Sequence, residues 1–234
     1  MSFISAVIPA GGYGLRLGKR IPKALLKIDN KPIIIYTLEV IDIHPQIDEI
    51  VVVVPSDYEE LFKEKIKSFN FKKVKAVIKG GLTRQESVRR ALINLSYDSE
   101  WVLIHDGVRP FINLKLISKV IQEAKKGEGA VLGIPIDSTV KRIKENKNRL
   151  FIERTVKRDK LWQIQTPQVF KKELILEAHR RFKDRSFTDD AVLLEKLGYK
   201  IAVVEGSYFN IKITYPQDLV LAKYILRLKK IYGI

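Results

Sequence analysis

The sequence predicts an α/β fold: a Rossmann-like, mainly parallel sheet with helices on both faces and a protruding β-hairpin arm. Two observations support this prediction. Apolar, β-branched runs alternate with segments of helical periodicity as far as Pro135, which is typical of βαβ units. Beyond Pro135 this alternation stops, and two polar-alternating runs flank a short turn. A chain of 234 residues is within the reach of one α/β domain, so we expect a single domain over 1–234.

The first part of the chain alternates strands and helices. Its expected strands are the apolar runs at 3–9, 49–55, 74–78, 101–105 and 130–135. Such continuous apolar runs are typical of strands that are buried on both faces of a parallel sheet. Helices are expected where apolar residues recur every three or four positions, at 31–42, 58–69, 84–95 and 114–126. Right-handed crossovers through these helices would cover both faces of the sheet.

The second part begins with the hairpin. Residues 138–156 alternate polar and apolar residues about the turn at 145–148, which predicts an arm over about 136–158. A charged hairpin that projects from a parallel sheet is either a lid or an oligomer contact. The remaining elements are expected to be a return segment at 161–170, helices near 172–182 and 189–197, strands at 201–205 and 210–214, and a last helix from Pro216.

Composition excludes several classes of protein. The chain has no cysteine, which rules out disulfides and cysteine-ligated metals and is compatible with a cytoplasmic protein. No apolar run reaches the length of about 18 residues that spans a bilayer, and no secretory signal is recognisable at the N-terminus, so we expect no membrane partner. The net charge of +16 indicates either a polyanionic partner or solvated lysines on helix faces. We expect no nucleic-acid partner, because no DNA-binding motif and no cluster of base-stacking aromatics is apparent.

Polar residues and glycines follow the expected strands. In an open parallel sheet, ligands bind beyond the carboxyl ends of the strands, where these segments would meet. The residues in question are Ala10, Gly11, Gly12, Gly14, Arg16 and Lys23 after the first strand, Gly80 and Gly81 after the third, Asp106 and Arg109 after the fourth, and Thr139 after the fifth. Glycines let backbone N–H groups approach phosphate oxygens, arginine and lysine neutralise phosphate charge, and a carboxylate suits Mg²⁺. This combination is what a nucleoside triphosphate with a bound cation requires.

Each motif also has a structural interpretation. The first glycine cluster is neither a P-loop nor a dinucleotide fingerprint, because its spacing fits neither pattern, and it is equally a candidate for a tight turn. Asp106 is as good a candidate for a helix cap or for an ion pair with Arg109. The segment 188–190 could simply cap a helix. The three histidines lack metal-ligand spacing, so we expect structural roles for them.

Eight motifs follow one another along the chain: PAGGYGLRL, PKALL, GGLTRQESV, HDGVRPF, PIDSTVK, RTVKRDKLWQIQTPQVF, FTDDA and EGSYFNIKITYPQDL. Together they resemble the 2-C-methyl-D-erythritol 4-phosphate cytidylyltransferases of the non-mevalonate isoprenoid pathway, from near residue 4 to near residue 225. The resemblance implies an enzyme that binds CTP and Mg²⁺ and forms 4-diphosphocytidyl-2-C-methyl-D-erythritol and pyrophosphate. It also implies a homodimer that exchanges the β-arm, so that Thr139 and Arg158 could serve the partner's site.

The resemblance assigns a role to each matching position. Arg16 and Lys23 match the pair that stabilises the transition state, and Arg158 and Lys212 match the residues that hold the methylerythritol phosphate. Asp106 matches the metal-coordinating acid. The residues that match the cytidine and triphosphate cradle are Ala10, Gly11, Gly12, Gly14, Gly80, Gly81 and Ser87. Those that match substrate-side contacts are Arg109, Thr139, Thr188 and Thr214.

The departures from the family pattern are modest. Gly12 stands where many relatives have alanine, Gly107 and Val108 replace a common Ala-Ala pair, and Lys157 replaces the usual acid before the arm arginine. The motif HDGVRPF is also similar to the ribitol-5-phosphate cytidylyltransferases. The segment 161–170 and the closing FNIKITYPQDL fit the methylerythritol enzyme better, so ribitol 5-phosphate remains the alternative acceptor.

Overall fold

The computed structural model describes residues 2–18 and 20–232, and within them a seven-stranded sheet in the order β11-β7-β10-β6-β1-β4-β5 forms the centre. The strands of this sheet are β1 (Phe3–Pro9), β4 (Glu49–Val54), β5 (Val74–Lys79), β6 (Ser99–Ile104), β7 (Gly129–Pro135), β10 (Trp162–Lys171) and β11 (Ala202–Glu205). β10 runs antiparallel to both of its neighbours, and the other pairs are parallel. The expected mainly parallel α/β sheet is therefore confirmed.

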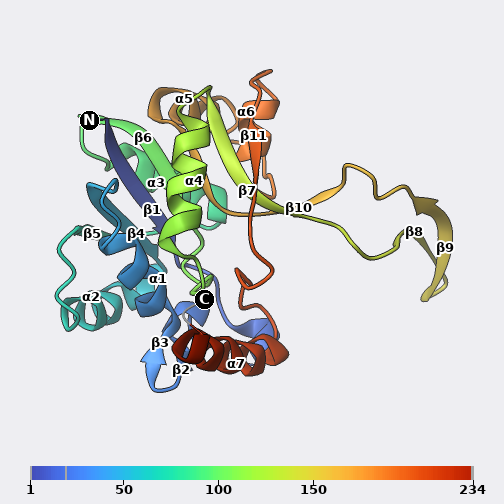
Figure 1. Ribbon diagram of the computed structural model, residues 1–234, viewed down its shortest axis with the longest axis horizontal. Coiled ribbons are helices and arrows are strands. Elements are labelled where there is room, and N and C mark those ends of the chain that lie inside the picture. The colour runs from blue at the N-terminus through green and yellow to red at the C-terminus, as the bar shows by residue number, and fades with distance from the viewer. Residues whose placement is uncertain (1, 19, 233–234) are drawn as a thin grey trace.

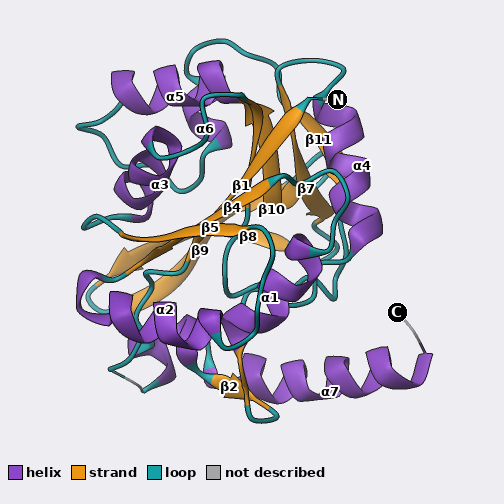
Figure 2. Ribbon diagram, turned by 90° about the vertical axis from the view of Figure 1, so that its left-hand side faces the viewer, coloured by secondary structure: helices purple, strands orange, loops and turns teal. Residues whose placement is uncertain are grey.

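Helices cover both faces of the sheet. They are α1 (Ile33–Asp42), α2 (Glu59–Lys67), α3 (Arg84–Ile93), α4 (Leu114–Ala124), α5 (Lys172–Arg181), α6 (Ala191–Glu195) and α7 (Pro216–Tyr232), with 3-10 turns at Leu15–Leu17, Lys23–Leu25 and Ser56–Tyr58. Figure 2 shows α3, α5 and α6 on one side of the sheet and α1, α2 and α4 on the other. No helix among the described residues is long and apolar enough to cross a membrane.

The core divides into two layers because side chains alternate along each buried strand. In β4, Ile50, Val52 and Val54 pack with α1, α2 and α4, whereas Val51 and Val53 pack with α3 and α5. Every residue of β4 is buried, as its apolar run from Ile50 to Val54 predicts, and Glu49 is buried with hydrogen bonds to Ser5 and Ser96. Burial on both faces fixes the register of the central strands and hence the position of the loops that leave their carboxyl ends.

The arm is a hairpin of β8 (Val140–Asn146) and β9 (Arg149–Val156) that pair only with each other. Lys147 and Asn148 both have positive φ, which suits a two-residue turn and brings the strands directly together. Figure 1 shows the arm extending far from the rest of the molecule. The predicted hairpin is confirmed, and the predicted boundaries are close to those observed.

One expected strand is absent from the described part of the chain, and two elements were not predicted. Residues 210–214 were expected to form a short strand, but they follow an irregular path without a partner strand, and their backbone bonds go instead to side chains and loop carbonyls. The return segment becomes the long antiparallel strand β10, inserted between β6 and β7. A small hairpin, β2 (Lys27–Ile28) with β3 (Lys31–Pro32), also precedes α1, so the helix expected from residue 31 begins at Ile33.

Candidate active site

A cleft of about 910 Å³ lies beyond the carboxyl ends of β1, β4, β5 and β6. Its walls combine backbone from two glycine loops with side chains from the segments after the strands. The sequence-predicted residues that line it are Ala10, Gly11, Gly12, Arg16, Lys23, Gly80, Gly81, Ser87, Asp106 and Lys212. A second hollow of about 500 Å³ lies at the outer edge of the sheet between α2 and β5, but it has neither a glycine loop nor a carboxylate. The cleft is therefore the candidate site.

The first glycine loop is a folded turn that is hydrogen-bonded to β4 at its start and closed by a bond within the loop. Ala10 N donates to Val53 O at 2.7 Å, and the N–H of Lys23 donates to Gly12 O at 2.9 Å, which closes the loop. A Cβ on Gly11 would meet nothing within 4 Å, and one on Gly12 would meet only Lys23 Cε at 3.4 Å. Packing therefore does not demand glycine here. The open space beside the backbone is suited to a ligand that approaches the loop closely.

The second glycine loop is braced by side chains of α3. Ser87 Oγ accepts from Gly81 N at 3.0 Å, and Glu86 Oε2 accepts from Leu82 N at 2.8 Å. Arg90 Nη1 donates to Gly80 O at 2.8 Å. A Cβ on Gly80 would lie 2.7 Å from Ser87 Oγ, and one on Gly81 would collide with Glu86. Glycine is needed at both positions because a Cβ would occupy the space through which Ser87 and Glu86 of α3 reach the loop backbone.

Lys23 is a buried cation at the floor of the cleft. Its side chain is only 6% exposed, and Nζ donates to Ile213 O at 3.4 Å. Burial lowers the pKa of Lys23, and the positive charges of Lys212 and Arg16 lower it further. Arg16 is exposed and lies over the ring of Tyr215, with its guanidinium carbon 5.5 Å from the ring centre. A phosphate in the cleft would relieve the mutual repulsion of these three cations.

Asp106 is the only carboxylate that lines the described cleft, and three cations surround it. Lys212 Nζ lies 2.9 Å from Oδ2, Arg109 Nε lies 3.4 Å from the same oxygen, and Arg84 Nε lies 3.3 Å from Oδ1. Burial by itself raises the pKa of Asp106, but the charges of Arg84, Lys212 and Arg109 outweigh burial and hold the pKa well below its usual range. Asp106 is therefore an anion at any physiological pH.

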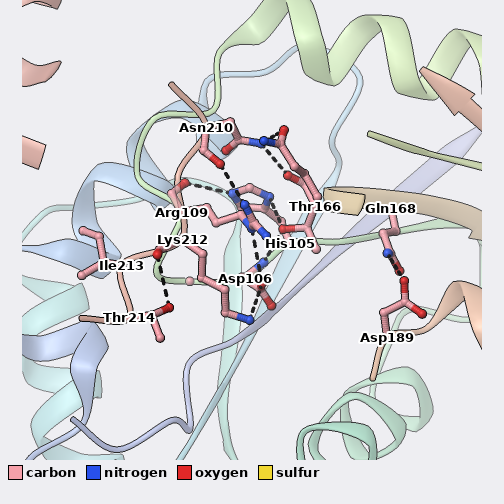
Figure 3. Close-up of polar contacts among 12 residues, drawn as sticks. His105, Asp106, Arg109, Thr166, Gln168, Asp189, Asn210, Lys212, Ile213 and Thr214 are labelled. Atoms are coloured by element: carbon pink, nitrogen blue, oxygen red, sulfur yellow. Dashed lines mark hydrogen bonds and ion pairs between the residues drawn. The ribbon is translucent and has the colours of Figure 1, made fainter. Parts of the chain in front are cut away.

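A buried polar cluster supports Asp106 from behind (Figure 3). The hydroxyl of Thr166 accepts from Asp106 N at 3.0 Å and lies 3.0 Å from His105 Nδ1. The other ring nitrogen of His105 lies 3.1 Å from Arg109 O, which is an acceptor, so Nε2 carries the proton. Burial lowers the pKa of His105 to about 4, so the ring is neutral and structural, as its sequence context predicts.

Arg84 was given no role from the sequence, yet it connects two buried carboxylates. Its Nη1 lies 2.6 Å from Asp190 Oδ2, and its Nε reaches Asp106. Asp190 Oδ1 in turn lies 3.1 Å from His179 Nε2. Burial lowers the pKa of Arg84, but the charges of Asp190 and Asp106 more than compensate and raise it above its usual value. The signal that could have found Arg84 is its position, directly after a glycine loop and in the first turn of a helix.

A model of the 2-C-methyl-D-erythritol 4-phosphate cytidylyltransferases matches residues 4–228. The enzyme of that name from Desulforamulus reducens is 43% identical over 230 residues, covering 97% of both chains. The one from Clostridium tetani is 46% identical over 220 residues, covering 93% of this chain and 88% of the relative. This chain belongs to the 2-C-methyl-D-erythritol 4-phosphate cytidylyltransferase family.

Solved structures agree with this membership. The crystal structure of 4-diphosphocytidyl-2C-methyl-D-erythritol synthase from Anaerococcus prevotii superimposes with a TM-score of 0.82 at 33% identity, covering 97% of this chain and 96% of that one. The cytidylyltransferase from Thermus thermophilus gives a TM-score of 0.77 at 34% identity, covering 96% and 99%. The family resemblance inferred from the ordered motifs is confirmed.

Not every family-matched residue lies in the cleft. Thr139 and Arg158 are exposed on the distant arm, and Thr188 is exposed in the loop before α6 without lining the cleft. Thr214 Oγ1 donates to Lys212 O at 3.2 Å, so it braces the chain beside Lys212. Two other residues lie behind the cleft wall. Gly14 is a buried turn residue whose N–H donates to Ile21 O, and Arg109 is buried beneath Asp106.

One departure from the family pattern has a packing reason. A Cβ on Gly107 would lie 2.7 Å from Ile34 Cδ1, so in this chain the side chain of Ile34 fills the space that an alanine methyl group would take. At Gly12, by contrast, there is room for the alanine of many relatives.

The donor set fits a metal that is held mainly by phosphate. The described residues contain no group of three or more His, Cys, Asp or Glu side chains arranged to hold a metal by themselves. Mg²⁺ is commonly bound by one or two carboxylates together with substrate phosphates and water, and Asp106 provides one hard oxygen donor at the cleft. Lys212 would have to leave Oδ2 for that oxygen to contact a cation.

Proposed function

We propose that this cleft transfers the cytidylyl group of CTP to 2-C-methyl-D-erythritol 4-phosphate and releases pyrophosphate. One observation carries the proposal: in a chain of this family, Arg16, Lys23, Asp106 and Lys212 converge on a single cleft that two glycine loops also line. The segments that bear them are far apart in sequence. Such convergence at the carboxyl edge of a parallel sheet is characteristic of a nucleotide site.

In this proposal, CTP lies across the two glycine loops. The open backbone at Gly11 and Gly12 receives the triphosphate, and the braced loop at Gly80 and Gly81 holds the cytidine. Because α3 fixes the second loop before any ligand arrives, little ordering entropy is lost on binding. Ser87 acts through the loop, since its hydroxyl is already engaged with Gly81 N and Thr83 O.

The reaction is an in-line displacement at the α-phosphorus. An oxygen of the acceptor phosphate forms a new P–O bond there, and the bond to the β-phosphate bridging oxygen breaks, so that pyrophosphate leaves. Lys23 and Arg16 lie where they can neutralise the charge that grows on the α-phosphate and on the leaving group. No general base is required, because a phosphate monoester is already largely ionised at neutral pH.

Mg²⁺ is the proposed cation, and Asp106 would hold it together with phosphate oxygens. When bound, such an ion neutralises triphosphate charge and orients the phosphates. The contribution of the protein is to keep Asp106 ionised and fixed, through the N–H bond from its own backbone to Thr166 and the flanking arginines.

Lys212 is the proposed anchor of the acceptor phosphate, with Arg158 and Thr139 supplied by the arm of a second subunit. Arg109, Thr188 and Thr214 remain predicted substrate-side contacts.

A homodimer is supported by the arm, because an isolated two-stranded hairpin is at best marginally stable in water. Its Ile143, Leu150, Phe151 and Ile152 are between 44% and 72% exposed, which suits a surface that another chain covers. We also propose a cytoplasmic location, with which the absence of cysteine is compatible.

The test is an acceptor comparison. Pyrophosphate release is measured with CTP and Mg²⁺, and with either methylerythritol 4-phosphate or ribitol 5-phosphate at matched concentrations. The proposal requires turnover with methylerythritol phosphate and a kcat/KM at least about 100-fold lower with ribitol phosphate, a difference of roughly 3 kcal/mol. Equal or preferential use of ribitol phosphate would contradict the acceptor assignment, and no release with either would contradict the reaction.

A further inference from the structure

The segment 206–214, here called the strap, carries Lys212 to the cleft without belonging to any sheet or helix. Its backbone contacts with the body are few. Gly206 N donates to Gly133 O at 2.7 Å, and Ile213 N donates to Val108 O at 3.0 Å. Between these two ends, the chain must be held by something other than a β-ladder, since the strand expected from the sequence does not form.

Gln165 of β10 fills this role for the first part of the strap. Its Nε2 donates to Ser207 O at 2.9 Å, and its Oε1 accepts from Ser207 N at 3.4 Å. The side chain therefore imitates a strand edge, offering one donor and one acceptor to the same residue. A Cβ on Gly206 would lie 2.5 Å from Gln165 Oε1, so the glycine is required for this close approach. Gln165 is only 4% exposed.

Asn210 continues the support toward Lys212 and is fully buried (Figure 3). Its Nδ2 donates to Thr166 O at 2.9 Å and to Gln165 Oε1 at 3.2 Å. Both partners are acceptors, which fixes the orientation of the amide. The backbone carbonyl oxygen of Asn210 accepts from Arg109 Nη1 at 2.8 Å, and Arg109 also contacts Asp106. Lys212, two residues later, is thus held in register with the carboxylate that it faces.

We propose that Gln165 and Asn210, here called the amide clamp, are positioning residues that set where Lys212 meets the acceptor phosphate. The inference rests on the proposed function, in which Lys212 anchors that phosphate. Neither amide lines the cleft, and both are buried with their Nδ2 or Nε2 groups bonded within the protein. Their effect is transmitted through the backbone of the strap. Buried, hydrogen-bonded amides are rigid, and a displacement of about 1 Å of a group that orients a reactant costs on the order of 100-fold in rate.

The chain offers a matched control on the same strand. Gln168 of β10 is 1% exposed, and its Nε2 donates to Asp189 Oδ2 at 3.0 Å, on the side away from the strap. Figure 3 shows this pair separate from the cluster around Asn210. Gln165→Met and Gln168→Met each remove a buried glutamine amide, that of Gln165 with three hydrogen bonds and that of Gln168 with one. They differ in which segment loses its support.

Three quantities are measured for each variant: kcat/KM for methylerythritol phosphate at saturating CTP, the Kd of CTP by calorimetry, and the melting temperature. We expect Gln165→Met to lower kcat/KM for the acceptor roughly 10- to 100-fold, with the Kd of CTP changed less than about twofold. Gln168→Met should lower the melting temperature by less, because it removes fewer hydrogen bonds, and should leave kcat/KM for the acceptor within about threefold. Equal losses of kcat/KM in both variants, or a loss confined to CTP affinity, would overturn the clamp.

A second pair of variants protects the test against misfolding. Gly206→Ala should displace the Gln165 amide from the opposite side and give the same selective loss of kcat/KM for the acceptor. In a Lys212→Ala background, Gln165→Met should cause little further loss, because both changes act on one contact. If Gln165→Met lowered kcat/KM by the same factor in the Lys212→Ala background as in the wild-type protein, the proposal would be contradicted. If the wild-type protein itself fails to turn over methylerythritol phosphate, the proposed function fails, which is a different outcome from a clamp variant that behaves like its control.

Discussion

The cleft and the arm differ in how they hold cationic side chains. At the floor of the cleft and behind its wall, Lys23 and Arg109 are each less than a tenth exposed, and each donates to a backbone carbonyl, whereas Arg16 at the cleft is exposed. On the arm, Arg158 is exposed, as is nearly every residue of β8 and β9. The cleft is ordered by its own chain. Among the described residues, the arm is held by its own ladder, a cross-strand contact of Lys141 with Thr155 and an ion pair between Arg142 and Glu153.

The difference shows which part of the site one chain can complete. A buried cation is held in place before the ligand arrives, and electrostatic stabilisation of a transition state depends on such preorganisation. An exposed arginine at the base of a projecting hairpin gains a fixed position only when another surface meets it. The nucleotide half of the proposed site is therefore intrinsic to the chain, whereas the proposed contribution of the arm residues would require a partner.

The largest expected effect tests the cleft side of this comparison. Lys23→Ala removes a buried cation that no neighbouring side chain replaces in position, so kcat should fall roughly 100- to 1,000-fold. The Kd of CTP should change much less, because Arg16 and the glycine loops remain. Steady-state kinetics and calorimetry give the two quantities. A collapse of CTP affinity that accounts for the whole loss of kcat/KM would show that Lys23 serves ground-state binding instead.

Asp106→Ala should have the next largest effect and should act on the metal response. Without the carboxylate, activity should become far less responsive to Mg²⁺, and kcat should fall about 100-fold. A Mg²⁺ titration of pyrophosphate release measures the response, and direct binding of Mn²⁺ in the presence of CTP, followed by electron paramagnetic resonance, provides a readout that is independent of turnover. An unchanged titration would remove Asp106 from the metal role and leave it as the counter-ion of Lys212.

The arm side is tested by deletion of its tip. Replacing residues 143–152 by a two-residue turn removes the exposed apolar side chains and leaves the base of the hairpin. We expect a monomer by sedimentation and a fall of about 10- to 100-fold in kcat/KM for the acceptor, with CTP affinity nearly intact. A fully active monomer would show that the arm is dispensable, and the division of the site between two chains would be wrong.

The sequence predicted the framework well because the framework depends on local patterns. Runs such as 50–54 are apolar throughout, and that pattern is typical of a strand inside a covered parallel sheet. The carboxyl ends of such strands lie at one edge, which is why Lys23 and Asp106 could be placed together without a structure. The hairpin was predictable for the same reason, from alternation about a turn.

What the sequence could not supply was long-range pairing. Residues 210–214 have the apolar alternation of a strand, but Asn210 is bonded to the side chains of Gln165 and Arg109, 45 and 101 residues away, and no local rule links these positions. Arg84 was overlooked for a similar reason. Its partners Asp106 and Asp190 lie 22 and 106 residues away, and only the folded chain brings the three together.

The smallest expected effect concerns pH and sharpens the contrast between a buried and an exposed cation. Burial, with Lys212 and Arg16 nearby, lowers the pKa of Lys23, so the folded protein loses this proton at a lower pH than the unfolded chain does. As pH rises through that lowered pKa, kcat/KM for CTP should fall because the neutral amine no longer attracts phosphate. Over the same window, between the folded and the unfolded pKa, the unfolded state binds more protons, so this group makes stability rise with pH. The two trends have opposite signs, which a general alkaline denaturation would not produce.

Lys23→Arg should move the fall in kcat/KM to higher pH, since a guanidinium keeps its charge. Rate profiles and chemical denaturation from pH 7 upward measure both trends, and a parallel loss of rate and stability would show that another group governs the alkaline limb.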